Sequence, residues 1–512
     1  MRIPRMRWLD LGLVLVFVLV AGAITGLSYF DSEGCLFEDS TQYLKLAQSL
    51  VDGKGWVTTP CNFESDEGGA FFAVWPVGYP VMIALVSLLT GLSVFSASKA
   101  VSVILVALLI LILRRSFGAA AVVCACTLMF APFLEIFSFT MSEVPFVFGL
   151  VWFCVSLHAF MKRPGAPRAL IIVASAFLVF SVRYIGIFTI GVCGLLALYY
   201  LGRREYRVMA LVLVAVVLGV FLMGAYLFNN YRETGYITGM PRAPSFEPWQ
   251  DKLAALAGTL LFMLNPMVLK TLGEINRLYA VLFAGTFLFQ VALVFYFRIR
   301  TRAWRRAQGP PVDELESILF LVGAVHWAAV IFLHWTSNID LFNYRLFAPG
   351  ALLFMLGGIH HLYRRQSQAV FNVFAQCVAA MAIAAYGLHF PLKVLKHSLL
   401  DQEPSYAQNM DALQSRYADI PAGSAVMIAN SHLNYLRPDL RILFPYFGAR
   451  RMGGRVLFYS ETFEELVSRA ERMPYRHVFL DVRETIHNAG RVDPSFRVVA
   501  ENNSRDSFVR IR

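Results

Sequence analysis

Charged side chains are scarce in this sequence. Asp, Glu, Lys and Arg together make up 15% of its 512 residues, whereas hydrophobic residues make up 57%. A soluble domain carries about 25% charged residues, so this composition excludes an ordinary soluble protein. Long apolar runs recur from Leu11 to Phe390. The chain is therefore expected to be a polytopic α-helical membrane protein.

The chain also lacks the signatures of several other classes. It has no internal repeat and no low-complexity segment. Its net charge of +11 comes from short basic clusters between apolar runs, so no nucleic-acid partner is indicated. The tail, residues 391–512, has no glycine-rich phosphate loop after a strand, so no nucleotide cofactor is expected.

The apolar runs predict eleven membrane spans. With this assignment the basic clusters fall on one side of the membrane, which the positive-inside rule makes cytoplasmic. The N-terminus is then cytoplasmic and the tail extracytoplasmic, in what we interpret as a bacterial cytoplasmic (inner) membrane. The predicted spans are residues 8–30, 98–114, 118–134, 145–161, 168–182, 185–201, 207–228, 279–298, 316–335, 346–363 and 369–390.

Two apolar segments leave alternatives open. The first follows "MRIPRMR", and its apolar run of about 20 residues is longer than the 7–15 of a signal-peptide core. We interpret it as a retained span, with a cleaved signal peptide as the alternative because "AGA" resembles a cleavage site. Residues 79–91 are too short for a span of about 17–25 residues. We expect them to be re-entrant or interfacial; a tilted crossing that includes residues 92–97 is the alternative.

Composition divides the chain into two domains. Residues 1–390 form the membrane domain, with outer loops at 31–97 and 229–278. Residues 391–512 read as a small extracytoplasmic α/β domain. In it, "SAVMIAN" and "HVFLDV" predict buried strands, "ETFEELVSRAERM" predicts an amphipathic helix, and "FRVVAENNSRDSFVRIR" predicts a hairpin around an Asn/Ser/Asp turn.

The first outer loop contains "FEDSTQYLKLAQSLVDGKGW", with adjacent acids Glu38 and Asp39. The apolar positions after Asp39 have helical spacing, which predicts a helix to Leu50 lying in the membrane interface. Asp39 or Ser40 is expected to cap its start, and "DGKG" to end it. The simplest interpretation makes Asp39 a helix cap and Glu38 a solvated acid.

A second acid lies in the next outer turn. Glu143 occurs in "SFTMSEVPF", at the start of a predicted span, and a rigid "WPVGYP" turn (75–80) lies between the two acid sites. Because both turns face the same side of the membrane, the acids of the first loop and Glu143 are predicted to converge on one cavity.

The order of these motifs resembles the GT-C superfamily of membrane glycosyltransferases. The best match is to the branch of the protein O-mannosyltransferases and the lipid A aminoarabinose transferase, which is bacterial glycosyltransferase family 39-like. The likeness covers residues 8–200 well and 316–390 loosely. It rests on "EDSTQYLKLAQSLVDGKGW…WPVGYPVMIAL", on "MSEVPF" (141–146), on "VRYIG" (182–186) and on "NYRLFAP" (343–349).

The resemblance implies a GT-C fold and a glycosyltransferase. Such enzymes take a sugar from a polyprenyl-phosphate donor and transfer it to an acceptor hydroxyl on the outer face of the membrane, commonly with inversion. Asp39 occupies the family's acid position and is the candidate base. Relatives often have Asp-Glu or Asp-Asp here, so the choice between Glu38 and Asp39 stays open. Glu143 is expected to orient the acceptor or, with Asp39, to hold a divalent cation (Mg, Mn or Ca), although metal dependence varies in the superfamily.

The resemblance also suggests the residues around the donor. Arg183, Arg345 and Tyr184 are candidates for the donor phosphate, because a guanidinium binds phosphate oxygens in a fork. Arg183 interrupts a long apolar stretch, where an unpaired cation is costly; a snorkelling arginine at the headgroup level is the alternative. The candidate cavity residues are Tyr43, Trp75, Tyr79 and Tyr344.

Two of the seven cysteines, Cys35 and Cys61, lie in the first outer loop, where an oxidising compartment permits a disulfide between them. The expected partners are a polyprenyl-phosphate sugar donor, membrane lipids, and a lipid, glycan or protein acceptor. A lipid or polysaccharide transporter or flippase without transferase activity is the alternative function. A polysaccharide polymerase or ligase and a non-catalytic scaffold are further rivals.

Overall fold

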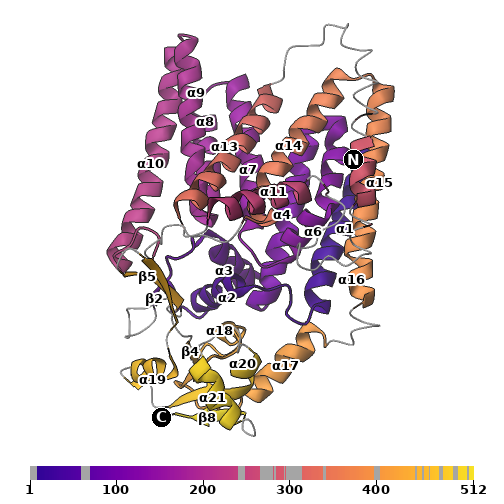
Figure 1. The fold of residues 1–512 in the computed structure, drawn as a ribbon. Helices are drawn as coiled ribbons and strands as arrows, with labels where there is room; N and C mark the ends of the chain where they lie inside the picture. Colours follow the sequence, from indigo (N-terminus) through magenta and orange to yellow (C-terminus); the bar gives the residue numbers. More distant parts are fainter. Residues whose placement is uncertain are drawn as a thin grey trace. The chain divides into compact units, whose positions relative to one another are not determined.

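The structure is a computed structural model, and it is dominated by helices (Figure 1). It divides into two compact units, one built from residues 1–30, 99–227 and 247–403 and the other from residues 31–98, 228–246 and 404–512. The structure describes residues 8–58, 70–239, 248–263, 265, 281, 284–292, 295, 314–337, 342–396, 404–443, 447–452, 455–460, 462–471, 477–487, 494–503 and 507–511.

The first unit is a bundle of apolar helices. Helix α7 contacts α8, α13 and α14, and α13 also packs along α14. The helices that lie wholly or largely in this unit are α1 (Trp8–Phe30), α4 (Val94–Phe117), α5 (Ala121–Cys126), α6 (Ala131–Ser138), α7 (Glu143–Lys162), α8 (Ala166–Val182), α9 (Phe188–Gly202), α10 (Tyr206–Thr234), α11 (Trp249–Met263), α13 (Glu314–Thr336), α14 (Tyr344–Arg365), α15 (Gln368–His389) and α16 (Pro391–Lys396).

Within the described residues, eight helical stretches are long and apolar enough to cross a membrane. They are Trp8–Phe30, Val94–Met129, Glu143–Lys162, Tyr184–Gly202, Tyr206–Thr234, Glu314–Thr336, Tyr344–Arg365 and Gln368–Leu395. The polytopic membrane architecture expected from composition is confirmed. Helix α8, with 17 residues, occupies another expected span but is shorter than these eight.

The expected span at residues 118–134 does not appear as a single helix. Residues 118–134 form short helical pieces, because the backbone is extended at Phe130 and α6 starts afresh with Pro132 in its first turn. Of residues 279–298, the structure describes 281, 284–292 and 295, which are helical. The total of eleven spans therefore stays a prediction.

The second unit combines the first loop with the tail. The loop contains α2 (Glu38–Val51), the antiparallel strands β1 (Val57–Thr58) and β2 (Ala70–Phe71), and α3 (Gly78–Thr90). Helix α3 has 13 residues and packs against α2. Because it is shorter than a span, the interfacial or re-entrant interpretation of residues 79–91 remains the favoured prediction.

The tail holds a four-stranded sheet in the order β4-β3-β7-β8. Strand β3 pairs in parallel with β4 and β7, with Ala425 opposite Arg441 and Val478, whereas β8 is antiparallel to β7. The tail elements are α17 (Tyr406–Arg416), β3 (Ala425–Met427), α18 (Leu433–Leu436), β4 (Arg441–Leu443), β5 (Phe447–Met452), β6 (Arg455–Ser460), α19 (Phe463–Glu471), β7 (Val478–Asp481), α20 (Val482–His487), α21 (Pro494–Asn502) and β8 (Phe508–Arg510).

The central strand is buried on both faces. Ala425 and Met427 pack with Leu466 of α19, whereas Val426 packs on the opposite face with residues that include Tyr417 and Leu433. A strand covered on both faces reads as a continuous apolar run, and this is why "SAVMIAN" predicts a buried strand. The strands expected in "SAVMIAN" and "HVFLDV" and the helix expected in "ETFEELVSRAERM" are all present.

The predicted hairpin at the end of the chain was wrong. Its first arm is the helix α21, and its second arm, β8, pairs with β7 instead. Phe496 and Ala500 are both buried, and their separation of four residues is the period of a helix, not of a strand. Tertiary packing of this stripe against the sheet decided its structure.

Candidate functional site

One buried carboxylate in the first unit holds two guanidinium groups. Oε1 of Glu143 lies 2.6 Å from Nη1 of Arg183. The same oxygen accepts hydrogen bonds from Nη2 and Nε of Arg345, at 3.0 and 3.1 Å. The side chain of Glu143 is 1% exposed, whereas those of Arg183 and Arg345 are 23% and 17% exposed. The carboxylate is therefore interior, and the two cations reach the surface of this unit.

Helix packing brings these residues to one end of the bundle. Glu143 is the first residue of α7, and Arg183 directly follows the last residue of α8. The short connection 163–165 makes α7 and α8 antiparallel neighbours, so the start of one lies beside the end of the other. Arg345 is the second residue of α14, which also contacts α7.

Arg183 is presented by a tight turn. The backbone at Arg183 is extended, with φ −150° and ψ 126°, and a 3-10 turn over Tyr184–Ile187 leads into α9. The N–H of Gly186 donates to the carbonyl of Arg183 at 2.8 Å. A Cβ on Gly186 would lie 2.5–2.6 Å from backbone atoms of Val179 and Phe180. Only glycine lets this turn pack so closely on α8.

Arg345 is fixed by the start of its helix. Asn343 is the N-cap of α14, and its Oδ1 accepts a hydrogen bond from the backbone N–H of Leu346 at 3.3 Å. The amino ends of α7 and α14 both carry partial positive charge. The two guanidiniums donate to the single carboxylate oxygen of Glu143, and with the two helix amino ends they offer the donor groups that bind an anion such as a phosphate group.

Several neighbours of this cluster are aromatic. Arg183 lies over the ring of Phe146 at 5.8 Å, and Phe146 in turn contacts the buried ring of His326 at 5.5 Å. Tyr184 packs against Phe180 and Tyr226, at ring separations of 5.9 and 6.3 Å. The proposed phosphate contact of Tyr184 stays a prediction.

Sequence reasoning missed Glu135. The hydroxyl of Tyr344, a candidate cavity residue, donates a hydrogen bond to the carboxylate of Glu135. Glu135 is therefore a second acid of this unit that contacts a candidate site residue. The signal was available, because Glu135 interrupts the apolar run "APFLEIF", and an acid in such a run is by default a functional candidate.

The acids of the first loop lie in the second unit. Helix α2 is present where predicted, but its N-cap is Phe37 and not Asp39 or Ser40. Ser40 supports the start differently, since its Oγ accepts from the backbone N–H of Phe37 at 3.0 Å. Asp39 lies in the first turn of α2 and is half-buried, whereas the side chain of Glu38 lies outside the described structure. The expected end at "DGKG" is confirmed, with C-cap Asp52.

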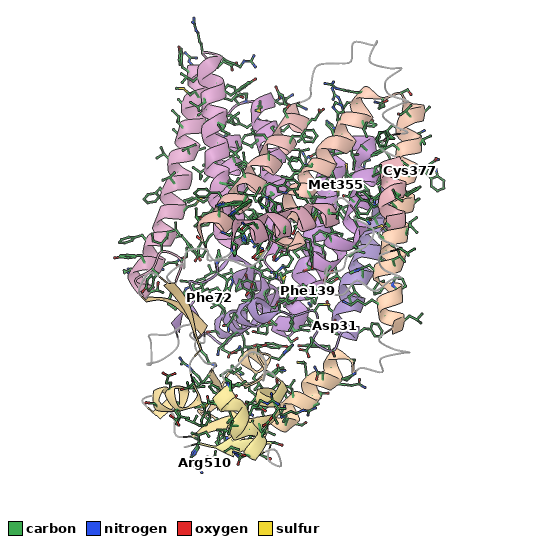
Figure 2. The ribbon with its side chains drawn as sticks, in the orientation of Figure 1. Asp31, Phe72, Phe139, Met355, Cys377 and Arg510 are labelled. Carbon is green, nitrogen blue, oxygen red and sulfur yellow. The ribbon has the colours of Figure 1, made fainter. Side chains whose placement is uncertain are left out.

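Three candidate cavity residues form one aromatic cluster with Phe72, which is labelled in Figure 2. The ring of Tyr43 lies 5.5 Å from Tyr79, 6.1 Å from Trp75 and 6.5 Å from Phe72. Tyr43 and Tyr79 are buried. The cluster thus supports the fold of the loop that carries Asp39, and its role in lining a substrate cavity stays a prediction.

The predicted convergence of Asp39 with Glu143 also stays a prediction, because the two residues belong to different units. A divalent cation fits poorly at Glu143, since two guanidiniums surround its carboxylate and repel further positive charge. Among the described residues there is no group of three or more His, Cys, Asp or Glu that could hold a metal ion.

One of the two cysteines of the predicted disulfide lies within the described residues. Cys35 is buried, and its backbone has a left-handed φ of 52°. Cys61 lies outside the described residues. The pairing of these two cysteines stays a prediction.

Solved structures of two membrane proteins are similar to this chain in fold. ArnT from Cupriavidus metallidurans, solved bound to undecaprenyl phosphate, shares 14% identity, with 94% of this chain and 95% of ArnT covered and a TM-score of 0.50. The oligosaccharyltransferase AglB from Archaeoglobus fulgidus, solved with an inhibitory peptide and a dolichol-phosphate, shares 13% identity, with 94% and 70% covered and a TM-score of 0.52.

At these identities the likeness shows the fold alone. The chain has the GT-C fold that its sequence motifs predicted. No protein-family model matches the chain, and no curated protein matches it in sequence.

Proposed function

We propose that this GT-C-fold membrane protein transfers a sugar from a polyprenyl-phosphate-linked donor to an acceptor hydroxyl on the outer face of the cytoplasmic membrane. The observation that carries the proposal is the pairing of Arg183 and Arg345 on the single carboxylate of Glu143. Solved neighbours of the same fold bind undecaprenyl phosphate and dolichol-phosphate, which are ligands of this chemical class.

The two arginines stabilise the departing lipid phosphate. As the bond between the anomeric carbon and the phosphate oxygen breaks, its electron pair leaves with the lipid phosphate, and negative charge grows on that oxygen. Guanidinium groups held in place before the reaction stabilise this charge without reorganisation. Glu143 orients both cations by accepting their hydrogen bonds, so its proposed role changes from contacting the acceptor to positioning Arg183 and Arg345.

The acceptor needs a base. Asp39 removes the proton of the acceptor hydroxyl as the new bond to the anomeric carbon forms, which requires the carboxylate within about 2.6–3.2 Å of that hydroxyl. Attack opposite to the departing phosphate inverts the anomeric centre. Glu38, its neighbour in the first turn of α2, is the alternative base. Residues 391–512 are proposed to lie outside the cytoplasm with the first loop, and the N-terminus inside.

A pair of conservative variants tests the base. Asp39→Asn keeps the shape of the side chain and removes the basic carboxylate, so transfer should fall by a factor of about 10² or more at unchanged protein level. Asp52→Asn is the matched control, because Asp52 ends the same helix and pairs there with the exposed Lys54. Retained transfer in Asp39→Asn would remove Asp39 as the base, and loss in Glu38→Gln alone would assign the role to Glu38.

The product is best identified in cells. Mass spectrometry of glycolipids from a deletion strain and its parent should show a glycan or lipid that loses one sugar in the deletion strain. A flippase would instead redistribute a lipid-linked sugar across the membrane without forming a new glycosidic bond. Finding no mass difference in any glycolipid or glycoprotein fraction would reject the transferase.

A further inference from the structure

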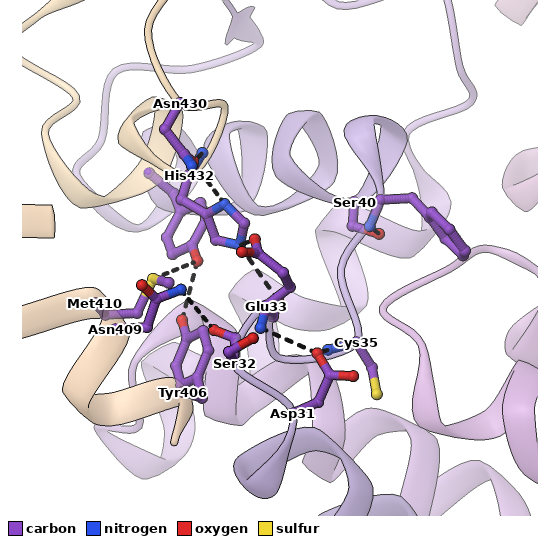
Figure 3. A network of polar contacts seen from close by, with 12 residues as sticks. Asp31, Ser32, Glu33, Cys35, Ser40, Tyr406, Asn409, Met410, Asn430 and His432 are labelled. Atoms are coloured by element: carbon purple, nitrogen blue, oxygen red, sulfur yellow. Dashed lines mark hydrogen bonds and ion pairs between the residues drawn. The ribbon is translucent and has the colours of Figure 1, made fainter. Parts of the chain in front are cut away.

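The turn that leads into α2 is held by side chains from the tail of the chain (Figure 3). Nε2 of His432 lies 3.2 Å from the carbonyl oxygen of Glu33 and 3.4 Å from its carboxylate. Nδ2 of Asn409 donates to the carbonyl of Ser32 at 2.8 Å. All four residues belong to the second unit. The contacts therefore join the first outer loop to the small α/β domain within one compact body.

His432 is itself held in place. It is 4% exposed, and its backbone N–H donates to Oδ1 of Asn430 at 3.0 Å. Nδ1 of its ring lies 2.8 Å from the same oxygen. Asn430 follows the end of the central strand β3, after Ile428, whose φ is +54°. Both ring nitrogens face oxygen acceptors, so the neutral ring donates to one of them and the protonated ring to both. A buried ring held in this way can set the position of the loop that it contacts.

Steric fit reinforces these hydrogen bonds. Tyr406 of α17 stacks on Phe95 with ring centroids 3.8 Å apart, and its hydroxyl lies 3.0 Å from that of Tyr435. Gly34 has φ +68°, and a Cβ there would lie 2.5 Å from the ring of Tyr406 and 2.8 Å from that of Phe95. The next residue, Cys35, is also left-handed. Left-handed backbone at a residue other than glycine persists where its surroundings determine it.

The contacts of His432 with Glu33 and of Asn409 with Ser32, which together we call the clamp, lie directly before the acid-bearing helix. Helix α2 begins at Glu38, shortly after the left-handed turn, and the turn therefore sets the direction in which the helix starts. Helix α18, which directly follows His432, packs against α2 itself. The small domain thus contacts both the entry to α2 and its side.

We propose that the α/β domain positions the catalytic first loop, with His432 as the positioning residue that acts through Glu33 on α2 and hence on Asp39. The proposal rests on the proposed function for its catalytic consequence, but its structural part is independent of that function. A misplacement of a reacting group by about 1 Å costs a factor of about 10² in rate, so a clamp on this turn has a measurable effect.

The first experiment compares two histidines of the same domain. His432→Ala removes the contact with Glu33, whereas His477→Ala, the control, removes contacts with Arg510 and Phe479. Hydrogen–deuterium exchange of amides 38–51 in the purified full-length protein should rise several-fold in His432→Ala and stay at the wild-type level in His477→Ala. The turnover number should fall roughly 10- to 100-fold in His432→Ala at an unchanged donor KM. His432→Gln, which can still donate to the Glu33 carbonyl, should recover part of the loss.

The second experiment compares two glycines of similar conformation. Gly34 and Gly91 have φ of +68° and +72°, so alanine strains the backbone similarly at both. Only at Gly34 does the new Cβ meet Tyr406, because nothing lies within 4 Å of a Cβ on Gly91. Gly34→Ala should therefore raise the exchange of α2 and lower turnover, and Gly91→Ala should not. This pair remains informative if His432→Ala fails to fold.

The outcomes separate the two proposals. Unchanged exchange of α2 in both His432→Ala and Gly34→Ala overturns the positioning role. Faster exchange with unchanged turnover, in a protein that Asp39→Asn inactivates, overturns it as well. If the wild-type protein transfers no sugar while exchange of α2 still responds to both variants, the transferase proposal fails and the clamp on α2 stands.

Discussion

Arg345 and Glu143 are 202 positions apart in the chain, yet two nitrogens of the guanidinium lie 3.0 and 3.1 Å from one carboxylate oxygen. The same oxygen accepts from Arg183 at 2.6 Å. One buried anion therefore supports two cations, and its removal affects both. Changing Glu143 therefore tests the stability of the protein, and changing Arg183 or Arg345 tests donor binding.

Glu143→Gln should destabilise the protein. Glutamine keeps the shape of the side chain but removes the negative charge that contacts both mostly buried guanidiniums, and breaking a buried ion pair costs about 3–5 kcal/mol. The expected result is a lower midpoint of thermal unfolding in detergent. The control is Glu233→Gln, whose partner Arg232 is two-thirds exposed, and whose effect should be within about 0.5 kcal/mol. Equal midpoints for the two variants would contradict the structural role of Glu143.

Arg183→Lys and Arg345→Lys should weaken the donor complex. Lysine keeps the charge but lacks the planar fork that contacts a carboxylate and a phosphate together. The donor KM should rise about tenfold for each variant, which corresponds to about 1.4 kcal/mol. Arg203→Lys is the control, since Arg203 is exposed and pairs with Glu205 and Tyr199 near the other end of α9. A donor KM that stays constant in both site variants would remove these arginines from phosphate binding.

Gly186→Ala should lower transfer through its effect on Arg183. The added Cβ would meet the backbone of α8, which cannot yield as a flexible side chain can, and the turn that presents Arg183 must shift. Gly191→Ala, in the following helix, meets nothing within 4 Å and serves as the control. Steady-state kinetics with a polyprenyl-phosphate sugar should show a higher donor KM only for Gly186→Ala. Similar kinetics for both variants would show that the turn has no strict packing requirement.

The pH dependence of stability should report on His432. Burial lowers the pKa of its imidazole below the usual value of about 6.5, although Glu33 and Asp31 oppose the shift. The unfolded chain then binds a proton more readily than the folded one, so this contribution to stability is complete above about pH 6.5 and is lost as the pH falls through the lower folded value.

Melting curves between about pH 7.5 and pH 5 check this expectation. The midpoint of the wild-type protein should fall more steeply towards low pH than that of His432→Gln, which has no titrating group at this position. His477→Gln retains His432 and should follow the wild type. A slope in His432→Gln equal to that of the wild type would show that the burial of His432 does not govern its titration.

Local patterns predicted much of the site's framework. The apolar stripe around Tyr43 predicted α2, because a helix that packs on one side needs apolar residues at this spacing. Arg183 was recognisable because an isolated cation in an apolar run is costly and calls for a partner. The resemblance of "MSEVPF" and "NYRLFAP" to GT-C motifs indicated Glu143 and Arg345, and the observed fold agrees with that resemblance.

The errors and omissions arose where long-range packing decides. The hairpin at the end of the chain failed because α21 buries Phe496 in a cluster with Ala425 and Met427 of β3, a strand much earlier in the chain. The two arginine partners of Glu143 were not predicted for a similar reason, since they follow it by 40 and 202 positions. Neither spacing is visible in a local pattern.

The sequence by itself determined that this is a many-span membrane protein with acids and arginines at loop positions, because hydropathy and charge act residue by residue. Only the tertiary structure decided that Glu143 serves two arginines and that the tail holds the turn before α2 through His432 and Asn409. The physical reason is that a buried charge or a left-handed turn is stable only with its partners in place, and chain folding, not sequence proximity, supplies those partners.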